Sequence, residues 1–209
     1  MNDKVRQYRG LSCAAWGYFF LNFHFRIGSV NLLPGFVGFL FLLGAIGALL
    51  PECRNLLLLR PLCIFFAAMY AVDWVLAVGG QQIGGHILFF DLLVTAAELY
   101  FHFQFLTDIA ALAKSCLPDG AKLAKRLFRC RTLYTLLSTA VAMAASVPAV
   151  VWPDHETGYS ENQGNILLML AVAGAGGGAG VSVAIMVTLF QVRKRFRDGD
   201  TVEREHCGT

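Results

Sequence analysis

The stretch Pro34–Leu50 reads PGFVGFLFLLGAIGALL and contains no charged side chain. Its length approaches the roughly 20 apolar residues that an α-helix needs to cross the hydrocarbon core of a bilayer. The whole chain shares this character, because 56% of its 209 residues are hydrophobic and only 15% are charged. A soluble domain is usually about 25% charged. The composition therefore predicts a membrane protein.

Further apolar segments lie on both sides of this stretch. The predicted transmembrane helices cover residues of about 8–25, 34–50, 61–79, 87–112, 132–152 and 165–192. They leave little chain for a soluble domain, and residues 193–209 form a polar tail. The sequence thus predicts an all-α fold, a polytopic transmembrane bundle of six helices in a single integral membrane domain over residues 1–209.

Lysine and arginine are distributed unevenly along the chain. Residues 1–10, 51–61, 113–132 and 193–209 contain 16 of the 17 basic residues, and Arg26 is the remaining one. Basic residues concentrate in the cytoplasmic segments of membrane proteins. We therefore expect a multi-pass protein of the cell membrane whose N- and C-termini are both cytoplasmic.

Cysteine usage and short motifs limit the chemistry that the chain is expected to perform. All cysteines lie at or near the predicted cytoplasmic side, and none belongs to a C-x-x-C pair. Reduced thiols are expected, and a zinc or redox motif has no support. The chain contains no G-x-S-x-G and no H-E-x-x-H motif, which argues against an enzyme without deciding the question. No cofactor is identified.

The segment 87–112 differs from the other predicted helices because it carries several ionisable side chains. Asp91, Thr95, Glu98 and His102 recur at the spacing of helical turns, which places them on one narrow stripe of a helix. Charged groups at membrane depth normally face the interior of a bundle or a water-filled cavity. We therefore expect the stripe to point inward.

Other polar residues are predicted to lie near the outer ends of neighbouring helices. Asp73 is placed at a depth similar to that of Asp91 when the two helices are aligned at their outer ends. This arrangement predicts an outward-facing pocket formed by the first, third and fourth helices. The candidates for its outer lining are Asn22, His24, Arg26 and His86.

A ladder of separated ionisable groups suits the movement of protons or cations. Asp91 and Glu98 are about 10 Å apart along a helix, so the stripe as a whole cannot bind one metal ion, and no metal site is predicted. Only His24 and His86 are placed to share a haem. We interpret Asp73 and the stripe as a polar path for ion- or proton-coupled transport of a small solute.

Two other interpretations remain open at this point. In the first, the chain is a non-enzymatic scaffold or accessory subunit, and a contact between Glu98 and His102 only fixes helix packing. In the second, the chain is a membrane-embedded enzyme that acts on a lipid, although no motif selects this reaction.

A short basic segment precedes the fifth predicted helix. Ala121–Arg129 places basic side chains against Leu123, Leu127 and Phe128, which predicts a short amphipathic helix on anionic lipid headgroups. The headgroup contacts are expected from Lys122, Lys125, Arg126 and Arg129. The expected partners are the bilayer and either a second copy or another membrane protein. Nucleic acid is not expected, since no reader module accompanies the basic residues.

The residues Val30–Phe39 read VNLLPGFVGF. This stretch resembles a motif of small, uncharacterised multi-pass membrane proteins of Gram-positive bacteria, in which Asn-(Ile/Leu)-Leu-Pro opens a helix. The resemblance covers the first two predicted helices and implies no activity. Pro34 suits the start of a helix, and Gly35 and Gly38 are expected to allow close helix packing.

Overall fold

The chain folds into a bundle of helices, described here from a computed structural model. The structure describes residues 3–23, 26–27, 30–31, 34–79, 88–117, 120–151, 177 and 180–197. The helices are α1 (Asp3–Asn22), α2 (Gly35–Leu49), α3 (Leu56–Val78), α4 (Leu88–Cys116) and α5 (Gly120–Val151), followed by a helical segment over 180–197. Two short antiparallel strands, β1 (Arg26–Ile27) and β2 (Val30–Asn31), connect α1 to α2. Within these ranges the fold is otherwise helical, as predicted.

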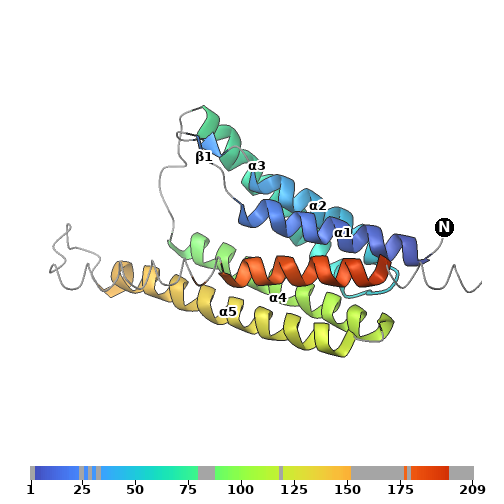
Figure 1. The fold of residues 1–209 in the computed structure, drawn as a ribbon. Coiled ribbons are helices and arrows are strands. Elements are labelled where there is room, and N and C mark those ends of the chain that lie inside the picture. Colours follow the sequence, from blue (N-terminus) through green and yellow to red (C-terminus); the bar gives the residue numbers. More distant parts are fainter. Residues whose placement is uncertain are drawn as a thin grey trace, which may run out of the picture.

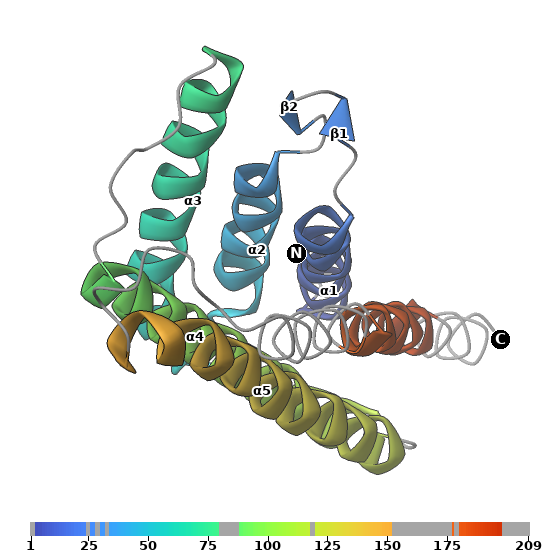
Figure 2. The ribbon, with the colours of Figure 1, turned by 90° about the vertical axis from the view of Figure 1, so that its left-hand side faces the viewer.

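The helices form two layers (Figures 1 and 2). The first layer contains α1, α2 and α3 side by side, and the second contains α4, α5 and the segment 180–197. In the first layer α2 packs against both of its neighbours, and in the second α4 packs against α5. The segment 180–197 also contacts α1, because Arg193 donates a hydrogen bond to the Tyr8 hydroxyl at 2.9 Å. Side chains from both layers therefore meet in the space between them.

Glycines bring α1 and α2 into close contact. A Cβ atom on Gly38 would lie 2.9 Å from the carbonyl oxygen of Gly17 and 2.7 Å from Cγ of Leu21. The same approach occurs near the other end of the pair, where a Cβ on Gly10 would lie 2.7 Å from Cγ of Leu49. Small residues at such contacts let helix backbones approach closely. Pro34 precedes α2 in an extended conformation, so the helix itself begins at Gly35.

Aromatic side chains fill the core between the layers. Phe39 of α2 lies 5.4 Å from Phe66 of α3 and 5.9 Å from Phe101 of α4, measured between ring centroids. Phe101 also stacks on Phe105 at 5.9 Å, and all four side chains are fully buried. Contacts of this kind add to the free energy gained by burying apolar area. They hold α4 against the first layer at the level of Glu98 and His102.

Several helices, among them α3 and α5, extend beyond their predicted spans at the same end of the bundle. α3 begins at Leu56 and includes Pro61, so much of the predicted loop 51–61 is helical. Ala121–Arg129 is helical, as predicted, but these residues form the first turns of α5 and not a short helix before it. Within those turns Leu127 is buried, whereas the side chains of Lys122, Lys125, Arg126 and Arg129 are exposed. The amphipathic pattern therefore serves helix packing on its apolar side.

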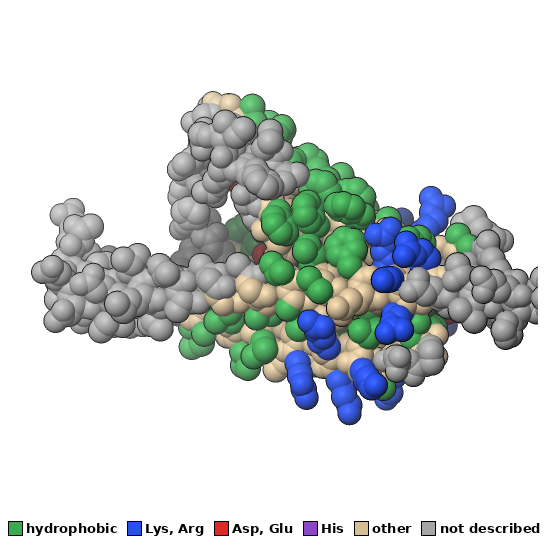
Figure 3. Space-filling view, viewed as in Figure 1, with side chains coloured by type: hydrophobic (Ala, Val, Ile, Leu, Met, Phe, Trp, Pro, Cys, Tyr) green, Lys and Arg blue, Asp and Glu red, His purple; other side chains and the backbone are tan. Residues whose placement is uncertain are grey.

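Basic side chains gather at one end of the molecule (Figure 3). The start of α1, the start of α5 and the end of the segment 180–197 lie at this end (Figure 1). One helix of the described part of the chain, Leu56–Val78, is long and apolar enough to cross a membrane, and Gly35–Leu49 is apolar but shorter. Only 17% of the most apolar 18 residues of α3 are buried.

Candidate functional site

A cavity of about 220 Å³ lies between the two layers. Each layer contributes side chains to its wall, since Tyr18 and Tyr70 come from α1 and α3, whereas Glu98 and His102 come from α4. The remaining lining residues are Leu21, Asn22, Gly35, Tyr134 and Ser182. Drug-sized ligands occupy about 300–1,000 Å³, and one water occupies about 30 Å³. The cavity is thus of a size for a small solute or a few waters.

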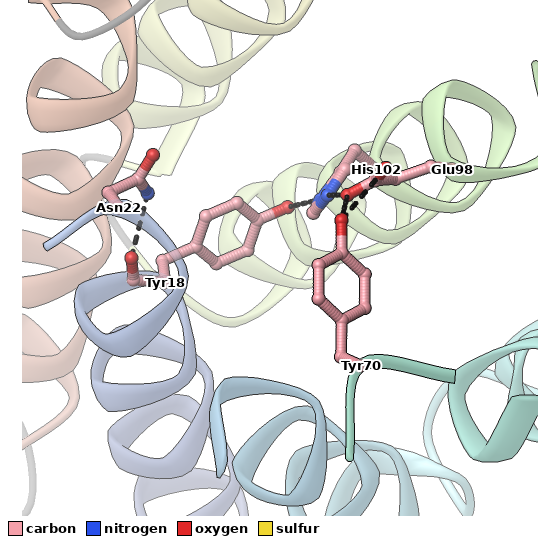
Figure 4. A network of polar contacts seen from close by, with 5 residues as sticks. All are labelled: Tyr18, Asn22, Tyr70, Glu98 and His102. Atoms are coloured by element: carbon pink, nitrogen blue, oxygen red, sulfur yellow. Dashed lines mark hydrogen bonds and ion pairs between the residues drawn. The ribbon is translucent and has the colours of Figure 1, made fainter. Parts of the chain in front are cut away.

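A polar network joins four of the residues that line this cavity (Figure 4). The Tyr18 hydroxyl lies 3.0 Å from Nδ1 of His102. On the other side of the imidazole, Nε2 lies 3.8 Å from Oε1 of Glu98. The Tyr70 hydroxyl donates to the same carboxylate, at 3.2 Å from Oε1 and 3.4 Å from Oε2. The network therefore links α1, α4 and α3 through two ionisable groups and two hydroxyls.

Burial holds the histidine in place. His102 is 4% exposed and Tyr18 is also 4% exposed, while the Glu98 side chain is 28% exposed. The imidazole packs against the rings of Phe101 at 5.5 Å and Tyr134 at 5.6 Å, measured between ring centroids. A ring held on several sides keeps its nitrogens aimed at fixed partners, which is what directed proton transfer requires.

The arrangement permits proton exchange between neighbouring groups. When His102 is neutral and its Nε2 carries the proton, Nδ1 accepts a hydrogen bond from Tyr18. When the imidazole is protonated, Nδ1 donates to the Tyr18 oxygen instead, and the adjacent Glu98 carboxylate balances the charge. Histidine is the side chain that most readily changes charge near neutral pH. Both protonation states of the imidazole are therefore compatible with the contact between Nδ1 and the Tyr18 hydroxyl.

The local sequence explains part of this geometry. Glu98 and His102 are four residues apart on α4, so they lie one above the other on one face. The neighbouring residues Leu92, Leu93, Tyr100 and Phe103 are exposed on other faces of the same helix. Asn22 donates to the carbonyl oxygen of Tyr18 at 2.7 Å and thereby satisfies a carbonyl at the end of α1. Gly35 leaves room for Tyr70, because a Cβ there would lie 3.3 Å from the tyrosine ring.

The structure brings together some of the residues that the sequence singled out. Glu98, His102 and Asn22 line the cavity, and Thr95 is half-buried one turn before Glu98. Asp73 is exposed on α3 and is not among the lining residues. The side chains of Asp91 and Arg26, and the whole of His24 and His86, lie outside the described residues.

Three tyrosines of the site were not predicted from the sequence. Tyr18 precedes Asn22 by one helical turn, and Tyr70 precedes Asp73 by about one turn. A tyrosine one turn away from a polar residue in an apolar helix is a signal that could have pointed to them. Tyr134 carries the same signal, with Ser138 one turn after it, whereas only the packing of the segment 180–197 brings Ser182 to the cavity.

A second buried carboxylate lies further along α4. Asp108 is 6% exposed and accepts a hydrogen bond from the Gln104 side chain at 3.1 Å. Its carbonyl oxygen lies 3.9 Å from the Cys53 thiol, in the connection between α2 and α3. Asp108 is not a lining residue of the cavity, so its hydrogen bonds tie α4 to this connection at the basic end of the bundle.

Known proteins provide no guide to the site. Comparison of the chain with protein families, curated proteins and solved structures gives no match. Among the described side chains, no group of three or more histidine, cysteine, aspartate or glutamate residues is placed to hold a metal ion. Any function must therefore be argued from the cavity and its polar network.

Proposed function

We propose that the chain is a polytopic membrane protein of the cell membrane with cytoplasmic N- and C-termini. The exposed face of α3 supports this, since an apolar helix in the core of a soluble protein would be mostly buried. The apolar side chains exposed along it are Leu57, Leu58, Ile64, Phe65, Val72, Val75 and Val78. In a bilayer, lipid would cover these side chains and keep them out of water, so they would need no protein partner.

The basic end of the bundle supports the proposed orientation. α5 would be about 48 Å long at 1.5 Å per residue, whereas the hydrocarbon core is about 30 Å thick. The first turns of α5 therefore extend beyond the core, and they carry Lys122, Lys125, Arg126 and Arg129. At the cytoplasmic surface these side chains meet anionic lipid headgroups.

Thiol labelling tests this orientation through a contrast between two cysteines. Cys116 is exposed at the end of α4. Burial, and then the negative charges of Asp108 and Glu52, raise the pKa of the Cys53 thiol to about 11. Since an ordinary cysteine has a pKa of about 8.5 and the thiolate is the reactive form, Cys53 should react on the order of 100-fold more slowly near pH 8.

In cells that express single-cysteine variants of the protein, a membrane-impermeant maleimide should label Cys116 only after the cells are permeabilised. Gly158→Cys, in the expected outer loop and outside the described residues, is the opposite control and should be labelled directly. Labelling of Cys116 in intact cells would contradict the orientation, and equal rates at Cys53 and Cys116 would contradict the burial of Cys53.

We further propose that the protein couples the movement of a small solute to that of protons. The Glu98–His102 pair beside a cavity is the observation that carries this proposal. Ionisable groups inside a membrane bundle are costly and mark ion or substrate pathways by default. The cavity lies between a layer of three consecutive helices and the layer that follows it, and transporter sites commonly lie between such halves.

Purified wild-type protein in liposomes tests the coupling directly. We expect an imposed pH gradient to drive the accumulation of a transported solute, and addition of that solute to change the internal pH. A pH-sensitive dye inside the liposomes reports the proton movement, and protein-free liposomes give the background. A solute library that produces no proton movement above this background, with protein whose unfolding transition is intact, would contradict the proposal.

A structural role for the same network is the second candidate. The Glu98–His102 pair accepts contacts from both α1 and α3, which is what a device for fixing helix packing would show. A purely structural role would need no open space beside the pair, so it does not explain why a cavity lies there. It predicts that loss of Glu98 lowers the stability of the bundle and that no flux exists to be lost.

A further inference from the structure

The chemistry of the cavity wall selects one class of solute. Glu98 is the only carboxylate among the described lining residues, and no lysine or arginine is among them. An anion in the cavity would meet this carboxylate with no described lysine or arginine to balance its charge. A cation would find a negative partner there, since a carboxylate offers about four acceptor positions and the described polar contacts to Glu98 come from the Tyr70 hydroxyl and His102 alone.

The aromatic content of the wall narrows the class further. Tyr18, Tyr70 and Tyr134 all line the cavity. Metal ions require several oxygen, nitrogen or sulfur ligands at about 2.0–2.6 Å, and no such described group of ligands is present. Tyrosine rings attract organic cations through their negative faces, and quaternary ammonium groups are the recognised example. With a volume of about 220 Å³, the cavity suits a cation of only a few heavy atoms.

We propose that the cavity binds a small organic cation of the alkylammonium type, which replaces the proton of the Glu98–His102 pair. This inference rests on the proposed function and names its substrate class. In the empty site, protonated His102 balances the Glu98 carboxylate. When the cation binds, its positive charge takes over this role, and His102 releases one proton to water. No bond to the solute forms or breaks, and the charge of the site is the same before and after.

The groups around the pair leave His102 as the source of that proton. The other helices contribute Tyr18 (α1), Gly35 (α2), Tyr70 (α3), Tyr134 (α5) and Ser182 (segment 180–197) to the wall. Tyrosine, glycine and serine side chains do not ordinarily titrate near neutral pH. Asp73 lies about one turn beyond Tyr70 on an exposed face of α3. Among the residue types that line the described part of the cavity, histidine is the one that ordinarily changes charge near neutral pH.

Calorimetric titration of the purified wild-type protein with tetramethylammonium tests the proposal. This probe has no titratable proton, so any pH dependence comes from the protein. We expect binding at about pH 8, weakening by up to about tenfold per pH unit as histidine becomes protonated. Titration in two buffers of different ionisation enthalpy should show release of a proton in the range where the imidazole is charged. The detergent must carry no cationic or amine oxide headgroup.

Matched ligands and variants identify the cause of any binding. tert-Butanol is close to tetramethylammonium in shape but uncharged, and it should not bind measurably. Glu98→Gln should weaken binding of the cation by about 30-fold or more, since it removes the charge opposite the ligand. Tyr134→Leu should weaken it by several-fold through loss of a ring. Glu52→Gln and Tyr100→Leu make the same two changes at residues outside the cavity wall, and both variants should bind the cation as the wild type does.

The outcomes separate this inference from the proposed function. If folded wild-type protein binds neither tetramethylammonium nor smaller methylammonium ions, the inference is overturned, although proton-coupled flux of another solute would still support transport. Equal binding of tert-butanol, or undiminished binding by folded Glu98→Gln, would overturn it as well. Binding without proton release would overturn the exchange with His102. Binding with proton release but no flux in liposomes would instead overturn transport.

Discussion

Replacing Glu98 by glutamine should reduce the proton-coupled flux in liposomes to the rate of protein-free vesicles. Glutamine has nearly the same shape, and its amide oxygen still accepts a hydrogen bond from Tyr70, whose hydroxyl lies 3.2 Å from Oε1 in the wild type. It has no negative charge, so it stabilises neither protonated His102 nor a cation in the cavity. The side-chain packing is retained, whereas the proton-binding pair is lost.

The matched control is Glu52→Gln, the same change at a glutamate in the connection between α2 and α3. Glu52 lies 3.6 Å from Arg6 in a partly exposed ion pair, and such pairs contribute about 0–1 kcal/mol. Its flux and its unfolding temperature should match those of the wild type. Wild-type flux in Glu98→Gln would eliminate the coupling role of the pair, and loss of the unfolding transition in that variant would favour the structural role.

Asp73→Asn separates the polar path predicted from the sequence from the smaller network found in the structure. The path included Asp73 as a member, whereas the network of Tyr18, His102, Glu98 and Tyr70 does not. Because Asp73 is exposed on α3, this variant should retain most of the flux. Loss of flux in this variant would mean that the functional residues include Asp73 and extend along α3 toward the residues beyond Val78.

Replacing Gly38 by leucine should destabilise the protein by about 3 kcal/mol in the free energy of unfolding, the upper end of the usual cost of overpacking. A Cβ at this position would lie 2.9 Å from the backbone oxygen of Gly17. A backbone atom cannot rotate out of the way, so α1 and α2 must move apart. That movement would also displace Tyr18 of α1 from His102, so flux should fall together with stability.

Gly47→Leu on the same helix is the matched control for this substitution. A Cβ on Gly47 meets nothing within 4 Å, and leucine has a higher helix propensity than glycine by about 0.8 kcal/mol. This variant should therefore be at least as stable as the wild type when thermal unfolding is followed in detergent. Similar unfolding temperatures for the two variants would show that the close approach of Gly38 to Gly17 is not required.

Part of the candidate site could be predicted from the sequence because it depends on a single helix. The spacing of Glu98 and His102 places both on one face of α4 whatever surrounds them. The low tolerance of membranes for charge suggested that this face was functional. Tyr18 and Tyr70 could not be found in this way, because their contacts with the pair join residues 84 and 28 positions apart.

The fold shows the same division. Sequence alone determined that the chain is helical, which segments are apolar, where basic residues concentrate and that Glu98 and His102 are neighbours. Each of these follows from composition or from helical periodicity, which are local properties. Tertiary structure decided that α4 meets α2 and α3 through the Phe39, Phe66 and Phe101 core, that Gly38 lies against Gly17, and that tyrosines enclose the pair. These contacts depend on how side chains of distant helices interlock, and apolar helices of similar composition carry little local information about which neighbour each will choose.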